Sequence, residues 1–499
     1  MGEIMSSKNF MNAVITLMTQ ILSLILKFVL QWVFIKTLGA EYLGYNSVFT
    51  NILQMLNMAD FGVGVAITSF LYKPISENNR KRINALMYLY RKIYTALGIF
   101  VFIVGMMILT ILPWIIPNAT CSNAYLRILF TINLAGTIST YFLAYNRSLL
   151  LAQQKAYYVN SVDFIVNLIV IVLQIITLFI WKSYIIYLLL SVGKNVISNY
   201  VVYSNCYKKN KFLKEETELL LVEEYRPKIW KYIKDVFISK VGAYIFYGTD
   251  NIIISIFKGP VLVGYLSNYT LVTVALQGII SQVFSALQAG LGYYLTITND
   301  IFLKRKKVNF YFNINYIIAN SCMVCCIFLF QPFINLYVGH GYLLSNITVY
   351  LLSINLYLTL MLNVPAQLFV IYKLHTYDKK IVALSAILNI VISASLVYGI
   401  GINGVLIGTF ITSIIYLFSR VFIYYKIILK VSFTKFLAQF FFWIIISVAT
   451  IIMLNYVDGF FPSSNWPLLL IKAMLLLCLS VLIPVVILLC GRFLQKRWT

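Results

Sequence analysis

Three lysines lie inside long apolar stretches of this sequence, at positions 27, 194 and 240. A charged side chain at the centre of a membrane helix costs roughly 2.5–3.5 kcal/mol on insertion scales, so such residues by default mark a functional pathway. Lys27 is too deep in its stretch to reach the membrane surface easily. For Lys194 a structural alternative is an internal ion pair, for instance with Asp163.

Polar residues accompany Lys27 and Lys240 at helical spacing. The first stretch carries Asn12, Thr16, Thr19, Gln20, Ser23, Lys27 and Gln31, and the later ones carry Lys240, Tyr244, Tyr247 and Asn251, then Gln277, Ser281, Ser285, Gln288 and Gly292. Residues three or four apart share one face of a helix. Lipid offers these groups no hydrogen-bond partner, so the stripes should face the protein interior or water. Hydrogen bonding between helices is the alternative.

From these patterns we select candidate site residues of two kinds. The substrate-binding candidates are Lys27, Gln31, Lys194, Lys240, Tyr244, Asn251 and Gln288, and the candidates for gating or ion coupling are Asp60, Asp163 and Asp250. We expect no metal site, because the cysteines at 322, 325 and 326 have no histidine or acidic neighbours. With only two histidines, both near expected loops, we assign no catalytic residues and no cofactor.

The composition indicates a membrane protein with many spans. Hydrophobic residues make up 61% of the 499 positions and charged residues 11%, which excludes an ordinary soluble domain. The net charge of +24 lies in short clusters between apolar stretches, which is typical of cytoplasmic loops and argues against nucleic-acid binding. The first residues do not resemble a removable signal peptide, and we expect no structural disulfide among the seven cysteines.

A bilayer core of about 30 Å needs roughly 20 helical residues, and the sequence contains fourteen apolar stretches of about that length. The expected spans are 11–35, 43–71, 93–116, 125–151, 157–181, 184–206, 233–257, 262–297, 309–336, 344–372, 381–400, 402–427, 435–456 and 466–490. Lysine and arginine clusters fall in alternate loops, so we expect both termini to be cytoplasmic.

The first twelve spans form an internal duplication with an offset of about 220 residues. Gly264-Tyr265 lies 220 positions after Gly44-Tyr45, and Pro332 corresponds to Pro113. Repeats of six spans enter the membrane in the same direction, which predicts two parallel six-helix lobes around a central cavity. The expected divisions are an N-lobe at 1–206, a cytoplasmic linker at 207–232, a C-lobe at 233–430 and two C-terminal helices within 431–499. The fold class is therefore an all-α polytopic membrane protein.

Two motifs near the first loop resemble a known family. Leu38-Gly39-Ala40-Glu41-Tyr42-Leu43-Gly44, then Ala59-Asp60-Phe61-Gly62 and a basic loop, look like the amino-terminal signature of Wzx-type polysaccharide flippases. These belong to the multidrug/oligosaccharidyl-lipid/polysaccharide exporter superfamily. The resemblance covers essentially the whole chain, with the last two spans as an addition to the twelve.

The resemblance implies a flippase of the bacterial cytoplasmic membrane. It would move undecaprenyl-diphosphate-linked oligosaccharide by alternating access, for lipopolysaccharide, capsule or exopolysaccharide synthesis. Lys27, Lys194 and Lys240 would bind the diphosphate, and glutamine and tyrosine side chains would bind sugars. Besides membrane lipids, a polysaccharide polymerase and a chain-length regulator are candidate partners.

Three other functions stay open. A flippase for peptidoglycan lipid II shares the fold and the carrier lipid. A multidrug or ion antiporter of the same fold is disfavoured, because the first span holds Lys27 and no acidic residue, where related multidrug exporters usually carry one. A membrane polymerase or glycosyltransferase is disfavoured because every expected outer loop is short.

Overall fold

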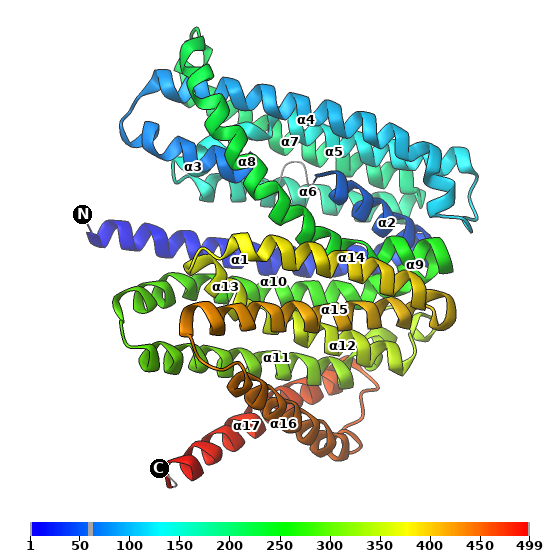
Figure 1. Cartoon of the computed structure of the whole chain (residues 1–499). Helices are drawn as coiled ribbons and strands as arrows, with labels where there is room; N and C mark the ends of the chain where they lie inside the picture. Colours follow the sequence, from blue (N-terminus) through cyan, green and yellow to red (C-terminus); the bar gives the residue numbers. More distant parts are fainter. Residues whose placement is uncertain (1, 58–62, 498–499) are drawn as a thin grey trace. The chain divides into compact units, whose positions relative to one another are not determined.

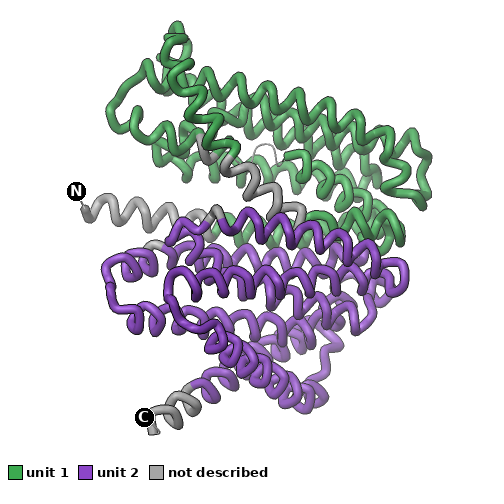
Figure 2. Tube along the Cα trace, viewed as in Figure 1, with its two compact units in different colours: residues 1–264 green, residues 265–499 purple. Residues whose placement is uncertain are grey.

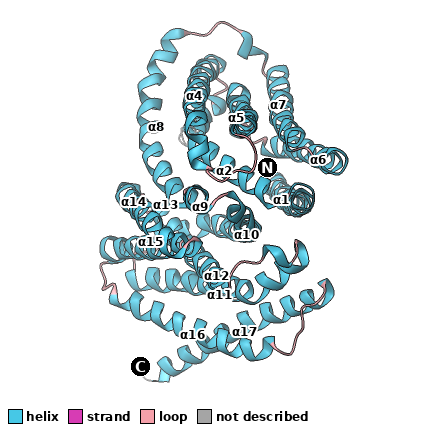
Figure 3. Ribbon diagram, turned by 90° about the vertical axis from the view of Figure 1, so that its right-hand side faces the viewer, coloured by secondary structure: helices cyan, strands magenta, loops and turns pink. Residues whose placement is uncertain are grey.

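Helices joined by short loops and turns, without a strand, make up the residues that the computed structural model describes, 2–57 and 63–497 (Figures 1 and 3). Side chains are described for 18–57, 63–64, 67–234, 248–288, 290–374 and 377–488. The helices are α1 (Gly2–Leu38), α2 (Ala40–Leu56), α3 (Val63–Ser76), α4 (Arg80–Ile115), α5 (Asn123–Ala152), α6 (Ala156–Trp181), α7 (Tyr184–Lys209), η2 (Lys211–Lys214), α8 (Leu219–Gly248), α9 (Asp250–Lys258), α10 (Pro260–Ile297), α11 (Ile301–Tyr337), η3 (His340–Tyr342), α12 (Asn346–Met361), α13 (Asn363–Ile371), α14 (His375–Ile400), α15 (Ile402–Ile423), η4 (Tyr424–Leu429), α16 (Thr434–Asp458) and α17 (Trp466–Arg497).

The all-helical membrane fold predicted from the sequence is confirmed. Among the described residues, 12 helices are long and apolar enough to cross a membrane. They match twelve of the expected spans. The other two, 43–71 and 233–257, fall on α2 with α3, between which residues 58–62 are not described, and on α8 with α9, which are separated at Thr249. The count of fourteen stays a prediction.

By its internal contacts the chain divides into two compact units, Met1–Gly264 and Tyr265–Thr499 (Figure 2). In unit 1, α5 packs along α4 and α7, α6 packs on α7, and α1 packs on α6. In unit 2, α11 packs on α12, α12 on α15, and α14 and α15 form a close hairpin. The expected lobe boundaries at 206 and 233 stay a prediction.

The two C-terminal helices, α16 and α17, pack on α11 of unit 2. Trp443 of α16 stacks on Tyr316 of α11, with the ring centroids 5.2 Å apart, and its indole N–H donates to Asn313 Oδ1 at 3.2 Å. The Tyr316 hydroxyl donates in turn to the Trp443 carbonyl oxygen at 3.0 Å. Stacking and hydrogen bonds together fix the added helices to the repeat.

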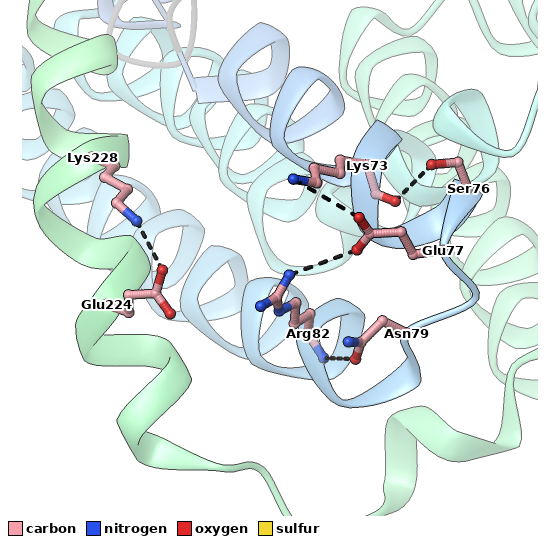
Figure 4. A network of polar contacts seen from close by, with 7 residues as sticks. All are labelled: Lys73, Ser76, Glu77, Asn79, Arg82, Glu224 and Lys228. Atoms are coloured by element: carbon pink, nitrogen blue, oxygen red, sulfur yellow. Dashed lines mark hydrogen bonds and ion pairs between the residues drawn. The ribbon is translucent and has the colours of Figure 1, made fainter.

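The segment expected to be a cytoplasmic linker is tied to the start of α4. Lys81 pairs with Glu218, and the Asn84 amide donates to the Glu215 carbonyl oxygen at 3.0 Å. Figure 4 shows the adjoining turn between α3 and α4, where Glu77 lies between Lys73 and Arg82, and Asn79 Oδ1 accepts from the Arg82 N–H at 3.1 Å. On α8 a further pair joins Lys228 to Glu224 at 2.8 Å. The helix expected in this linker begins at Leu219 and continues as α8.

The internal duplication is visible in the backbone where α2 and α10 begin. Gly39 precedes α2 with φ 89° and ψ 178°, and Gly259, 220 positions later, precedes α10 with φ 84° and ψ 168°. These conformations are open to glycine and strained for other residues. Each glycine N–H donates to the carbonyl oxygen four residues earlier, at 2.9 and 3.0 Å. The repeats therefore use the same sharp turn to redirect the chain.

Directly after these turns the first turns of α2 and α10 cross at a reciprocal contact, which lies wholly within unit 1. A Cβ atom added to Gly44 would lie 1.9 Å from the Pro260 carbonyl oxygen, and one added to Gly264 would lie 1.9 Å from the Ala40 carbonyl oxygen. The pairs are related by the repeat offset, so the contact has the two-fold character of a self-complementary interface. Close backbone approach through small residues four apart is a common way to pack membrane helices.

Glu41 fixes the α2 side of this crossing. Its carboxylate accepts hydrogen bonds from the Thr120 N–H at 2.8 Å, the Thr120 hydroxyl at 2.7 Å and the Tyr45 hydroxyl. Partial burial by itself would raise the pKa of Glu41, but these hydrogen bonds hold the pKa below 4.5. Glu41 is therefore ionised at neutral pH and ties the loop before α5 to α2.

We expect Gly44→Ala and Gly264→Ala each to lower the stability of the protein by about 1–3 kcal/mol, because the added methyl group must push two helix backbones apart. Thermal unfolding in detergent is the measurement. Both substitutions open the same crossing, so the double variant should lose less than the sum of the two. The control is Gly278→Ala in α10, where an added Cβ meets nothing within 4 Å. Equal stability of the three alanine variants would contradict the close contact between α2 and α10.

Candidate functional site

Four ionisable side chains from α1, α5, α6 and α7 interact within unit 1 and form a cationic cluster: the exposed Lys27 and the partly buried Arg147, Asp163 and Lys194. The helices that carry them pack on one another, α1 on α6, α6 on α7 and α7 on α5. Three cations against one carboxylate give the cluster a net formal charge of +2. A site with this charge is suited to an anion with two negative charges.

Arg147 and Asp163 form the fixed part of the cluster. The guanidinium group reaches both carboxylate oxygens, at 2.6 and 2.8 Å, which is the bidentate geometry that makes such pairs strong. Arg147 also donates to Asn199 Oδ1 at 2.7 Å and to the Ser198 hydroxyl oxygen at 2.8 Å, and the Ser198 hydroxyl donates to Asp163. Three helices are therefore joined at one polar node.

Lys194 lies one helical turn before Ser198 on α7 and is half-buried. It interacts electrostatically with Lys27 and with Asp163. In the part of the chain that the structure describes, neither Lys27 nor Lys194 has a hydrogen-bonded or ion-paired partner. The direct partner of Asp163 is Arg147, so the alternative ion pair between Asp163 and Lys194 does not form in this structure.

The remaining predicted site residues lie at other positions of the helices or outside the described residues. Gln31 lies one turn after Lys27 on α1, and Gln288 lies on α10 within unit 2. Asp250 and Asn251 begin α9, directly after the interruption at Thr249. Asp60 and the side chains of Lys240 and Tyr244 lie outside the described residues.

A cavity of about 200 Å³ with many polar lining residues lies between α2, α5 and α7. It includes Asn195, which follows Lys194 in the sequence. Sequence reasoning missed this cavity and did not select Arg147 as a site residue, since it grouped Arg147 with Lys155 among the basic residues of the cytoplasmic side. One signal could have found the arginine: Arg147 and Asp163 are each eight residues from Lys155 in the tight connection between α5 and α6. Residues equidistant from the turn of a helical hairpin lie at similar depth.

Comparison with known proteins gives the family. The model of the family described as "Polysaccharide biosynthesis protein" matches residues 10–288, which is more than half of the chain. The chain belongs to this family. A comparison with curated proteins found no significant match. The predicted resemblance to polysaccharide flippases is therefore confirmed at the level of the family.

Solved structures of the same fold are those of a flippase and of transporters. The inward closed lipid II flippase MurJ has a TM-score of 0.74 at 15% identity, over 96% of this chain and 100% of that one. An inward-facing multidrug resistance MATE transporter of the MOP superfamily has a TM-score of 0.61 at 16% identity, over 82% of this chain and 98% of that one. The outward-facing form of such a transporter has a TM-score of 0.54 at 16% identity, over 83% and 95%. The family member described here is thus a multi-pass membrane protein with the fold of these proteins.

We expect Arg147→Ala and Asp163→Asn each to destabilise the family member described here, because hydrogen bonds to charged groups contribute about 1.5–3 kcal/mol and either change leaves a charge without its partner. Thermal unfolding of the purified variants measures this loss. Arg147→Lys should recover little, since an ammonium group cannot make the bidentate contact. Arg127→Ala, at an exposed position of the same α5, is the matched control. Loss of stability with Arg127→Ala equal to that with Arg147→Ala would contradict the structural role of the node.

Proposed function

We propose that this protein is a flippase that moves undecaprenyl-diphosphate-linked oligosaccharide across the bacterial cytoplasmic membrane by alternating access, with both termini in the cytoplasm. The observation that carries the proposal is the pair of lysines in the cationic cluster. Lys27 and Lys194 are like charges within interaction range, on helices of a membrane bundle. Such a pair is unfavourable until an anion lies between the two ammonium groups.

A diphosphate matches the cluster in charge and in chemistry. The cluster has a formal charge of +2, and the two lysines are compact donors suited to phosphate oxygens. At about 4 Å and an effective dielectric constant near 20, one lysine and one phosphate charge attract by roughly 4 kcal/mol before desolvation. Arg147 is already satisfied by Asp163, so its role in this proposal is to hold α5, α6 and α7 in place.

The family gives the proposal its cargo class. Polysaccharides of the bacterial surface are assembled from lipid-linked repeat units, and a family named for polysaccharide biosynthesis with a transporter fold fits the transfer of such units. A polymerase and a chain-length regulator would be its partners after transfer. Lipid II, the cargo named for MurJ, has the same carrier and is the alternative that the experiment must separate.

The expected outcome concerns surface polysaccharide in cells that depend on this chain for export. Lys27→Ala and Lys194→Ala should each lower the polymer at the surface about tenfold, since a net loss of about 1.4 kcal/mol changes affinity by that factor. Lys27→Arg should retain more activity than Lys27→Gln. Immunoblots of the membrane fraction measure protein abundance, which should stay near the wild-type level.

The matched control is Lys208→Ala, an exposed lysine at the end of the same α7 as Lys194. Normal polymer from abundant Lys27→Ala and Lys194→Ala protein would refute the role of the lysines. Rescue of cells depleted of their lipid II flippase, without rescue of a polysaccharide export mutant, would assign the alternative cargo.

A further inference from the structure

The cavity between α2, α5 and α7 is lined by polar groups that carry no charge. Its amide side chains are Gln54, Asn57, Asn133 and Asn195. Hydroxyl groups of Thr50, Thr137 and Ser191 complete the polar lining. Neutral amides and hydroxyl groups can donate and accept further hydrogen bonds, so this lining is suited to a polar ligand without charge.

The amides of the cavity are held in position by the surrounding helices. Asn57 Oδ1 accepts from the Tyr141 hydroxyl at 2.7 Å, which turns its N–H groups toward other partners. Asn195 Nδ2 donates to the Gly136 carbonyl oxygen at 3.3 Å, which leaves its Oδ1 to accept. The cavity thus offers both donors and acceptors. Sugar hydroxyl groups, which donate and accept at once, fit such a mixed lining.

The floor of the cavity is rigid. A Cβ added to Gly136 would lie 3.1 Å from Cγ2 of Val192, so α5 and α7 are in close contact there. Ser191 is held by the Gln174 amide at 2.8 Å and donates to the Tyr187 carbonyl oxygen at 3.1 Å. A cavity with fixed walls gives hydrogen-bonding groups the preorganised positions that selective binding needs.

The size of the cavity limits its ligand. A volume of about 200 Å³ is below the roughly 300–1,000 Å³ of sites for drug-sized molecules, so it has room for one ring and not for a chain of sugars. It is also larger than the roughly 30 Å³ that a single water occupies. One sugar residue is the ligand of suitable size and chemistry.

The position of the cavity on α7, beside Lys194, indicates which sugar of the cargo would bind there. Lys194 and Asn195 are consecutive on α7, and their side chains diverge by about 100°, so one helix turn serves both the cationic cluster and the cavity. Resting on the proposed function, we infer that the cavity binds the sugar attached directly to the diphosphate, while Lys27 and Lys194 bind the diphosphate itself. Asn57, Asn133 and Asn195 would then select the first sugar of the cargo.

The test compares two lipids on the full-length protein in detergent: undecaprenyl diphosphate, and the same lipid carrying one N-acetylhexosamine. Wild type should bind the glycosylated lipid more tightly. Asn195→Leu should reduce that advantage by about tenfold, the value of a lost hydrogen bond in a dry site, and leave the affinity for undecaprenyl diphosphate unchanged. Thr137→Val, which removes one hydroxyl with little change of shape, should act in the same direction and decides the matter where Asn195→Leu fails to fold.

Asn205→Leu, near the end of the same α7 and outside the cavity, is the matched control and should leave both affinities at the wild-type values. Equal affinity of the wild type for the two lipids would overturn the sugar site and leave the proposed function intact. Variants that weaken the binding of both lipids to the same extent would also overturn the sugar site. Failure of the wild type to bind either lipid would overturn both proposals.

Discussion

A bilayer offers no hydrogen bonds, so each polar group on a membrane helix must find its partner in the protein, in water or in the cargo. This constraint explains most polar contacts of unit 2. Arg420 makes a bidentate pair with Asp378 at 2.8 and 2.7 Å, and Asn389 donates to the hydroxyl groups of Thr409 and Thr412. Lys472 pairs with Asp458 at 2.6 Å. In unit 1 the constraint is met at Arg147, whereas Lys27 and Lys194 make no direct hydrogen bond or ion pair within the described residues, and our proposal rests on these two lysines.

The two repeats solve the same packing problem with different residues. At an offset of 222 positions, Arg147 and Ser198 of unit 1 correspond to Phe369 and Arg420 of unit 2. The guanidinium of Arg420 lies 5.3 Å from the centroid of the Phe369 ring, so the equivalent helices meet at this place in both units. The arginine lies on α5 in unit 1 and on α15 in unit 2, and in both units it contacts the helix that carries the corresponding residue. Both repeats therefore hold an arginine at this joint, whereas Lys194 corresponds at the same offset to Tyr416.

Much of this organisation could be predicted from the sequence because it depends on repetition and on hydropathy. The offset of 220 positions matched Gly39 with Gly259 and Gly44 with Gly264, and the structure shows why: a turn that favours glycine, then a crossing that no side chain fits. The polar stripe predicted that Lys27 faces the protein interior or water, and its side chain is exposed in the structure. The cavity could not be predicted, since Asn57, Asn133 and Asn195 are ordinary residues until three helices bring them together. The sequence groups Arg147 with the basic residues near the loops, and its bidentate pair with Asp163 becomes visible only in the structure.

The central claim is that the chain itself carries a diphosphate-linked glycolipid between leaflets. Its most direct test is the initial rate at which purified protein in liposomes moves a fluorescent undecaprenyl-diphosphate-linked oligosaccharide to the outer leaflet, read from quenching by an impermeant reagent. The account predicts transfer that depends on the protein and is inhibited by added undecaprenyl diphosphate, with a labelled neutral glycolipid left in place. Equal transfer of the neutral glycolipid, or transfer no faster than in empty liposomes, would contradict it.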